Sequence, residues 1–392
     1  MIQDGPGAQA TGDAEPVTVR EVTGRRDRRV FLRLPWRLYA GDPLWVPPLL
    51  RGLTRTLDPK HNPALLNAEL ALFVAWRGGR PVGRISATVD RLHNEYRGVR
   101  TGFWGYFETE NDPAVAGALL DRAADHLRER GMIDMEGPVS PAAHGQCGLL
   151  VEGFDEPPAV SMPYNPPYYV HLVEQAGLKS VEEMYAYHLS FDTLGPESAA
   201  MQRLDRLARG IRRRHPGLTV RPIDMTRYEA DLLDLGRLAD TALEENPDHV
   251  PFTDDEMRAM AREVRGIIDP DLVLLADVAG TTVGCAFGLP DINPLLRKIN
   301  GRLFPLGWLK FIAGKRSIRS ARIIGWGALT EHRHMGVIPL LMHTLILNAR
   351  RRGYRDAELS WVAEENIKAF RTLERAVGPR LSKRYRIYRR DL

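Results

Sequence analysis

The sequence predicts an α/β protein built from two tandem copies of one unit, a mixed sheet with helices on both faces. Three observations support this prediction. Strand-like runs alternate with helical stretches, a glycine turn joins a strand to a helix within residues 322–362, and matching residues recur at a fixed offset. A helix between two strand-like runs is typical of a parallel pair, so each copy should contain one such pair.

Length and composition are those of a globular protein with two or three domains. The 392 residues are 44% hydrophobic and 27% charged, with a formal net charge of +4. No run of 18 apolar residues occurs, so we expect no membrane span. Residues 1–16 are polar and lack the apolar core of a signal peptide, which predicts a disordered tail.

The cysteines and the arginine-rich stretches indicate the cellular compartment and the kinds of partner to expect. Cys147 and Cys285 are too few for a disulfide framework, which favours a cytoplasmic protein. His144 lies near Cys147, but the pair is isolated, and we expect no metal site. Arginine-rich stretches at 212–214 and 350–352 are typical of solvated helix faces, so no nucleic-acid partner is expected.

The first half of the chain, residues 17–192, should form one domain. RGGRP between two β-rich runs is a hairpin signal, and Asp112 before Pro113 suits a helix N-terminus. In order, the expected elements are a strand at 17–21, a helix at 27–39, an extended segment at 41–50, hairpin strands at 70–76 and 82–89, a strand at 102–108, a helix at 113–130, a strand at 133–136, a loop-rich segment at 137–163, a helix at 168–175 and a strand at 184–191.

The second half, residues 216–392, follows a linker at 193–215 that contains a basic helix. Its expected elements are a strand at 218–222, helices at 228–243 and 253–268, hairpin strands at 272–277 and 282–289, a basic and aromatic insertion at 293–320, a strand at 322–329, a helix at 337–352, a strand at 357–362, a helix at 367–376 and a strand at 382–389.

An internal repeat relates the two halves, as in proteins that arise by duplication. Three features recur at the same offset: the hairpin Val-Gly (283 − 82 = 201), an asparagine (366 − 165 = 201) and a helix-ending glycine (378 − 177 = 201). The other helix-ending glycines differ by 353 − 131 = 222. The second half therefore carries about 21 extra residues before its helix, and the first half regains them after its own.

The stretch from Arg322 to Asn366 has the order strand, basic glycine loop, helix and strand. Free N–H groups in the first turn of such a helix point at an anion, and Pro339 suits that turn because it lacks an N–H. Arg333 and His334 add positive charge. The stretch is either a phosphate site or a crossover that only builds core.

These motifs resemble those of the GNAT superfamily of acyl-CoA N-acyltransferases, as two tandem domains. The family's Arg/Gln-x-x-Gly-x-Gly/Ala signature corresponds to residues 333–338, with Ile338 in place of the usual small residue. Its Asn-x-x-Ala-x-x-x-Tyr signature corresponds to residues 366–373, with Leu373 in place of tyrosine. GRISA, GFWGYFE, CGLLVEGFD, PYNPPYY and KRYRIYRR are similar to a group of long, largely uncharacterised bacterial GNAT-like proteins.

The resemblance implies that the second half binds acetyl-CoA or another acyl-CoA. The implied binding set is the backbone amides of Ala328 and Leu329 for the pantetheine arm, the N–H groups of Gly336, Val337 and Ile338 for the pyrophosphate, the basic side chains of Arg333 and His334, and Asn366 on the far side of the arm. The equivalent loop of the first half, residues 109–113, has no glycine and carries two carboxylates. We therefore expect the first half not to bind CoA in the usual way.

The implied reaction is direct attack of an amine on a thioester, which requires a base, an oxyanion donor and an acid. Glu331 is the candidate base, with Glu358, Glu364 and Glu365 near the same strand ends; each could instead be a solvated carboxylate.

Leu373 cannot donate the proton that a family tyrosine supplies to the departing thiolate. Tyr385 and Tyr388 on the closing strand are candidates for this acid, or else they pack there. His249 is a lone loop histidine and is usually structural or exposed in such a place.

The insertion at 293–320 mixes aromatic and basic side chains. It could be a lid whose cations meet CoA phosphates or an acyl carrier protein, a segment at a membrane surface, or a packed subdomain with its cations in solvent.

Three functions compete on the sequence alone. The first is an N-acyltransferase acting on a small-molecule or peptide amine. The second is a non-catalytic protein that binds or senses acyl-CoA, which Ile338 and Leu373 favour. The third is a tRNA-dependent aminoacyl transferase, which would require a basic helical arm that only residues 197–214 could supply.

Overall fold

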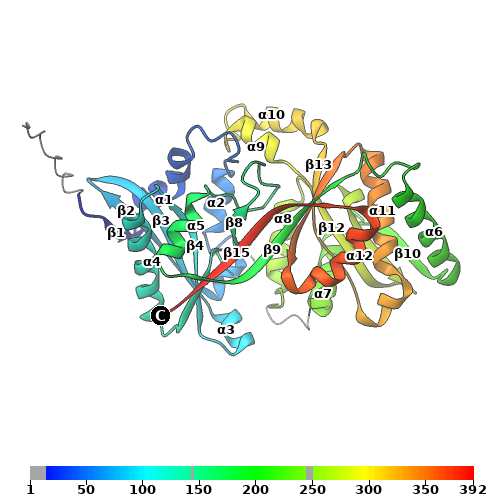
Figure 1. Ribbon diagram of the computed structural model, residues 1–392, viewed down its shortest axis with the longest axis horizontal. Coiled ribbons are helices and arrows are strands. Elements are labelled where there is room, and N and C mark those ends of the chain that lie inside the picture. The colour runs from blue at the N-terminus through cyan, green and yellow to red at the C-terminus, as the bar shows by residue number, and fades with distance from the viewer. Residues whose placement is uncertain (1–14, 143–144, 244–249) are drawn as a thin grey trace, which may run out of the picture.

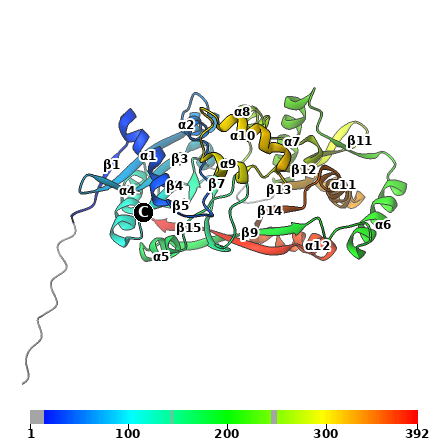
Figure 2. The ribbon, with the colours of Figure 1, turned by 90° about the horizontal axis from the view of Figure 1, so that it is seen from above.

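A computed structural model describes residues 15–142, 145–243 and 250–392. They form an elongated molecule in which one mixed sheet of 13 strands runs through both halves, with helices on both faces (Figures 1 and 2). The predicted fold class is confirmed. Apart from its last two residues, the tail expected at 1–16 lies outside the described residues. None of the helices in this described part is long and apolar enough to cross a membrane.

The first half follows the predicted order and adds short elements to it. Its elements are β1 (Thr18–Glu21), α1 (Arg25–Leu38), α2 (Leu50–Thr56), a 3-10 helix (Pro63–Leu66), β2 (Ala68–Arg77), β3 (Arg80–Asp90), α3 (Arg91–Arg97), β4 (Thr101–Thr109), α4 (Pro113–Arg128), β5 (Asp134–Gly137), β6 (Val139–Ser140), β7 (Gln146–Cys147), β8 (Leu149–Glu152), α5 (Tyr168–Gln175) and β9 (Lys179–Ser190).

The second half begins with the helix that the sequence placed in the linker. Its elements are α6 (Ala199–Arg214), β10 (Leu218–Pro222), α7 (Tyr228–Leu243), α8 (Asp254–Val264), β11 (Val273–Val278), β12 (Thr281–Pro290), α9 (Asn293–Ile299), α10 (Gly307–Gly314), β13 (Ser320–Ala328), a 3-10 helix (Thr330–Met335), α11 (Val337–Arg352), β14 (Asp356–Ala363), α12 (Ile367–Val377) and β15 (Arg380–Asp391).

The two halves exchange their closing strands. The sheet order is β1-β2-β3-β4-β5-β15-β9-β14-β13-β12-β11-β10, and the thirteenth strand, β8, pairs with β15 beside this path. β9 from the first half pairs with β14, where Leu189 is opposite Ala357, and β15 from the second half pairs with β5, where Tyr388 is opposite Gly137. β9 and β15 also pair with each other. The domain limits at 192 and 216 remain a sequence prediction, and each half needs a strand of the other to continue its sheet.

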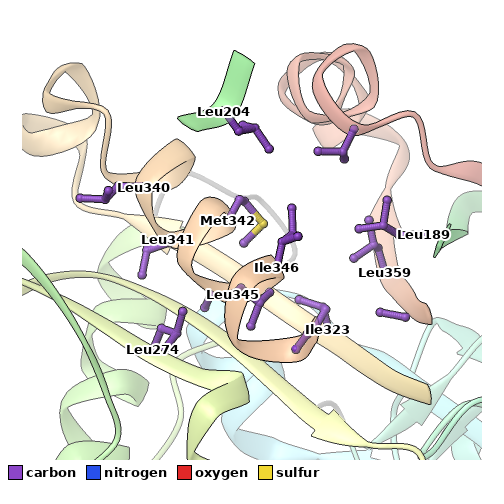
Figure 3. Packing of buried hydrophobic residues seen from close by; sticks show 14 of the residues in the cluster. Leu189, Leu204, Leu274, Ile323, Leu340, Leu341, Met342, Leu345, Ile346 and Leu359 are labelled. Carbon is purple, nitrogen blue, oxygen red and sulfur yellow. The ribbon is translucent and has the colours of Figure 1, made fainter. Parts of the chain in front are cut away.

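Helix α11 is the central helix of the second half. Figure 3 shows Leu204 of α6 and Leu274 of β11 on opposite sides of α11, with Leu341 and Ile346 among the α11 side chains that fill the space. α6 is therefore packed against α11 through buried residues such as Ile211 and does not stand away from the fold as an arm.

The internal repeat extends to side-chain contacts. Gly83 and Gly284 allow the parallel-pair helix to lie close on the hairpin of each half, because a Cβ atom at either position would collide with that helix. The helix residues involved correspond pair by pair: Val115 with Val337 (337 − 115 = 222) and Leu119 with Leu341 (341 − 119 = 222). This offset is the one seen at the helix-ending glycines.

Candidate functional site

A gap opens between the parallel strands β13 and β14. Only Ser320–Ile323 and Asp356–Leu359 are paired, and the strands diverge beyond them. The Leu329 N–H donates to the Val283 carbonyl at 2.9 Å. Because N–H directions alternate along an antiparallel strand, Ala328 directs its amide away from β12 and toward the gap. Of the two amides expected to face the gap, Leu329 is thus committed to the sheet.

The start of α11 lies at the end of this gap. Gly336 occupies the N-cap position with φ +81°, and no side chain caps the helix. A Cβ atom at Gly336 would lie 2.6 Å from Ile211 of α6, so both backbone conformation and space require glycine. Arg333 donates its Nε–H to the Ala328 carbonyl at 3.2 Å. An uncapped helix N-terminus beside a guanidinium is suited to an anionic group.

The predicted binding residues are only partly brought together. Four line one cavity: Ala328, Arg333, Ile338 and Asn366. Gly336 and Val337 do not line the cavity, and the Val337 side chain is buried. His334 is exposed on the loop and does not line the cavity.

The cavity has a volume of about 2450 Å³ and is lined by both halves of the molecule. Ordinary ligand pockets have volumes of roughly 300–1,000 Å³. Much of its lining is apolar, including Val160 and Met162 of the first half and Phe287, Leu289 and Ile324 of the second. At the gap, a Cβ atom at Gly325 would have no atom within 4 Å, so the strand presents open space there.

The corresponding gap of the first half is filled by the protein. β4 and β5 are paired over three residue pairs and then diverge. β6 enters the space between them, where the Tyr106 N–H donates to Ser140 Oγ at 2.8 Å. A Cβ atom at Gly105 would collide with the Val139 carbonyl. No arm of a ligand could lie between these strands.

The helix start of the first half is occupied as well. The Asp112 carboxylate accepts the N–H groups of Ala114 and Val115 at 2.9 and 3.4 Å and pairs with Arg77 at 2.6 Å. The carboxylate therefore stands where a bound phosphate would accept the same N–H groups.

Glu108 on β4 brings a carboxyl group to the cavity wall. It accepts hydrogen bonds from the hydroxyls of Tyr39 at 2.7 Å and Tyr169 at 2.9 Å, and Arg84 lies 3.5 Å away. Burial raises the pKa of Glu108, and the guanidinium and the two hydroxyls oppose this rise. The motif GFWGYFE marked this segment only by similarity, and no role for Glu108 could be predicted from the sequence, because its partners come from distant segments.

Glu108 matches Gly327 of the second half. The parallel pairs begin at residues 101 and 320 (320 − 101 = 219), and 327 − 108 gives the same offset. The first half thus has a carboxylate where the second half has glycine.

A buried polar cluster is formed by side chains of β13, β14 and β15, with β9 between β14 and β15 in the sheet. Lys383 pairs with Glu358 at 2.9 Å, and the Ser360 hydroxyl donates to the same carboxylate at 2.9 Å. Arg322 donates to Ser360 Oγ and to the Val160 carbonyl, each at 3.0 Å. Through Arg322, the cluster connects the first-half loop that contains Val160 to the strands of the second half. Glu358, a candidate base from the sequence, forms an ion pair with Lys383 in this cluster.

Asp291, at the end of β12, lies near this cluster. Burial raises the pKa of Asp291 to about 6, and the Glu358 carboxylate adds to the rise.

None of the three predicted catalytic residues lines the cavity. Glu331 is a solvated carboxylate with a 72% exposed side chain. Tyr388 is carried by β15 into the core of the first half, where its hydroxyl donates to Glu174 at 3.0 Å. Tyr385 is fully buried, and burial raises its pKa well above the usual value. The exchange of β15 moves both tyrosines from the expected position, which the order of elements did not reveal.

His144 and His249 lie outside the described residues, as do the side chains of Glu365 and Leu373. Within the described ranges, no group of three or more His, Cys, Asp or Glu side chains is arranged to hold a metal ion.

Comparisons with known proteins agree with this fold. The chain is 36% identical over 369 residues to a protein named bacterial ceramide synthase from Caulobacter vibrioides, covering 92% of this chain and 94% of that protein. It is 30% identical over 380 residues to protein YghO from Escherichia coli, covering 95% of each. No family model matches the chain.

Among solved structures, a tandem GNAT protein from the clavulanic acid biosynthesis pathway superimposes with a TM-score of 0.57. The alignment covers 96% of this chain and 98% of that one at 16% identity, so it shows a shared fold. The chain therefore belongs to the family of tandem GNAT-fold proteins that includes the bacterial ceramide synthase of Caulobacter vibrioides and YghO of Escherichia coli.

Proposed function

We propose that this protein is an N-acyltransferase that moves a long acyl group from acyl-CoA to the amino group of a long-chain amino lipid. The observation that carries the proposal is the 2450 Å³ cavity, which joins the β13–β14 gap to a carboxyl group of the first half. The product would be an amide with two long chains.

The second half supplies a plausible donor site for this reaction. The uncapped start of α11 and the Arg333 guanidinium would hold the pyrophosphate, and the Ala328 amide would bind the pantetheine arm in the gap. The larger side chain of Ile338 forms part of the cavity wall and leaves the β13–β14 gap open.

The size and apolar lining of the cavity favour long chains over acetyl groups and short amines. Burial of each methylene contributes about 0.8 kcal/mol, or roughly fourfold in affinity. The relative named ceramide synthase fits this choice, because a ceramide is an amide of a fatty acid with a long-chain amino alcohol.

In the proposed step the amine nitrogen attacks the thioester carbonyl, the carbon–sulfur bond breaks, and CoA leaves as the thiolate. Glu108 accepts the proton that the attacking nitrogen loses, and the thiolate is protonated from water. A carboxyl with a raised pKa is a better base than an ordinary one because its proton affinity is higher. The Tyr39 and Tyr169 hydroxyls hold the carboxylate in place.

The test is amide formation by the purified protein, measured by mass spectrometry. Acyl-CoAs of increasing length are offered with a sphingoid base and with a short amine. We expect turnover to require a long acceptor and to rise with acyl length. Binding of long acyl-CoA without amide formation on any acceptor would make the protein a sensor and refute the enzymatic proposal.

A pair of glycine variants tests the position of the donor. Gly325→Leu fills the gap without a backbone clash, because space is open there, whereas Gly117→Leu on α4 has equally open surroundings far from the gap. Acyl-CoA affinity should fall at least about tenfold in the first variant and stay unchanged in the second. Equal affinity in both would place the donor elsewhere.

A further inference from the structure

The α9–α10 insertion carries an exposed apolar surface. Fourteen large hydrophobic side chains are exposed in the described part of the chain, and five of them lie within nine residues of this insertion. They are Phe304, Leu306, Trp308, Leu309 and Ile312, with Phe304 77% and Leu306 62% exposed. Such a concentration exceeds the scattered exposure of single residues that is normal for proteins.

The same insertion is strongly basic. No Asp or Glu occurs from residue 292 to residue 330. Seven exposed cations lie around the apolar side chains, and none of them forms an ion pair with a carboxylate of the described residues: Arg297, Lys298, Arg302, Lys310, Lys315, Arg316 and Arg319. We call these cations and the five apolar side chains the basic apolar surface.

The insertion is held firmly to the rest of the molecule. Trp36 of α1 donates its ring N–H to Asn300 at 3.0 Å, and Arg297 donates to the Pro43 carbonyl at 2.7 Å. α9 buries Leu295 and Ile299, while α10 buries none of its residues. Figures 1 and 2 show α9 and α10 together over the middle of the molecule, between the two halves.

The basic apolar surface is continuous with the cavity. Phe304, Trp308 and Ile312 are exposed to solvent and also line the cavity wall. A ligand that leaves an apolar phase at this surface would therefore enter the cavity along apolar side chains, without crossing water.

We infer that the basic apolar surface docks the protein on an anionic lipid bilayer, so that the cavity takes up its lipid substrate from the membrane. Exposed aromatic and aliphatic side chains insert at the level of the headgroups, and exposed cations attract acidic phospholipids. The positive charge of this surface favours an anionic bilayer. The apolar side chains that the surface shares with the cavity wall connect the docked membrane to the substrate site. The uptake step rests on the proposed function, whereas the docking itself does not.

Vesicle co-sedimentation of the full-length protein without substrate tests the docking. We expect binding to phosphatidylcholine vesicles that contain phosphatidylglycerol, much weaker binding to phosphatidylcholine alone, and release at high salt. Leu306→Asp with Leu309→Asp should lower the partition coefficient about tenfold or more, because both side chains are exposed and neither lines the cavity. Lys310→Glu with Arg316→Glu should abolish the preference for anionic vesicles.

Matched controls separate docking from general surface effects. Leu347→Asp removes a leucine of α11 that is 44% exposed, and Arg25→Glu with Arg29→Glu reverses two exposed cations on α1. These variants should bind vesicles like the wild type, and the Leu306/Leu309 variant should keep wild-type activity on substrates dispersed in detergent.

Three results would overturn the inference: no binding of the wild type to anionic vesicles, equal binding by the Leu306/Leu309 variant, or capture of an acidic acyl carrier protein by this surface with no vesicle binding. Vesicle binding that follows the expected pattern, together with a protein that forms no amide, would refute the proposed function and leave the docking intact.

Discussion

The two halves share a framework and differ in what lies between their parallel strands. In the second half the gap is open at Gly325, and the helix beyond it begins at an uncapped glycine. In the first half β6 fills the gap, and Asp112 caps the helix. The difference shows that, in the first half, the protein's own backbone and a carboxylate occupy the positions that are open in the second half. The first half then presents Glu108 to the shared cavity.

The exchange of closing strands gives the largest expected effect. If the halves depend on each other's strand, residues 15–192 and 193–392 expressed separately should be insoluble or lack cooperative unfolding, because β5 and β14 each lose a paired neighbour. Co-expression of the two fragments should restore a folded complex, as judged by circular dichroism and size-exclusion chromatography. Cooperative unfolding of either fragment alone would show that the halves are independent.

Substitution of one glutamate from each half should have very different effects on kcat. Glu108→Gln should lower kcat for amide formation by about 10²–10³-fold, whereas Glu331→Gln, at an exposed carboxylate, should leave kcat unchanged. The base acts deprotonated, and burial raises its pKa, so the wild-type rate should rise with pH through a limb above the ordinary carboxyl range. The same limb in Glu108→Gln would assign it to another group.

Asp291 should make the protein less stable as the pH rises, whereas most carboxyl groups in folded proteins have the opposite effect. Its pKa of about 6 is raised from 3.8, so the folded state holds the proton more tightly than the unfolded state does. Protonated Asp291 contributes fully to the free energy of unfolding below pH 4, and this contribution is lost as the pH rises through 6. At pH 8 the Asp291→Asn variant should therefore have a free energy of unfolding in urea roughly 3 kcal/mol higher than that of the wild type, with little difference at pH 4. A wild-type advantage at pH 8 would contradict the raised pKa.

The start of α11 offers a charge test between isosteric variants. Asn and Asp have side chains of the same shape, and both are among the residues that adopt a left-handed backbone. Each meets Ile211 at position 336 in the same way, so the difference between the two variants isolates the added charge. Isothermal titration should show CoA bound about tenfold more weakly by Gly336→Asp than by Gly336→Asn, or about 1.4 kcal/mol. In the first half, Asp112→Asn should not create a second CoA site, because β6 still fills that gap; a stoichiometry of two would show otherwise.

The two tyrosines of the exchanged strand should give the smallest effect. Tyr388→Phe removes a hydrogen bond to Glu174 and should cost about 1 kcal/mol of unfolding free energy. Tyr385→Phe removes a buried hydroxyl that has no hydrogen-bond partner in the described structure, so it should be neutral or slightly stabilising. Urea denaturation measures both, and a larger loss at Tyr385 would indicate a partner for its hydroxyl.

Local patterns were enough to predict the mixed α/β fold, the duplication and the position of the glycine loop. Gly83 and Gly284 were recognisable as a repeated pair from the Val-Gly of each hairpin at the offset of 201, and the structure adds that a helix packs too closely there for a side chain. Gly336 was recognisable because a short basic segment that contains one glycine separates a strand-like run from a helical run along the chain. These features depend on neighbours in sequence or on a fixed offset.

The sequence by itself thus determined the framework and located the candidate donor loop. Only the tertiary structure decided that β9 and β15 change places, that Glu108 rather than Glu331 faces the cavity, and that Tyr385 and Tyr388 do not. The physical reason is that strand pairing and cavity walls join segments more than 100 residues apart, as in the pair Tyr388 and Gly137. Many registers satisfy the same alternation of apolar residues, and only packing of the whole chain selects one of them.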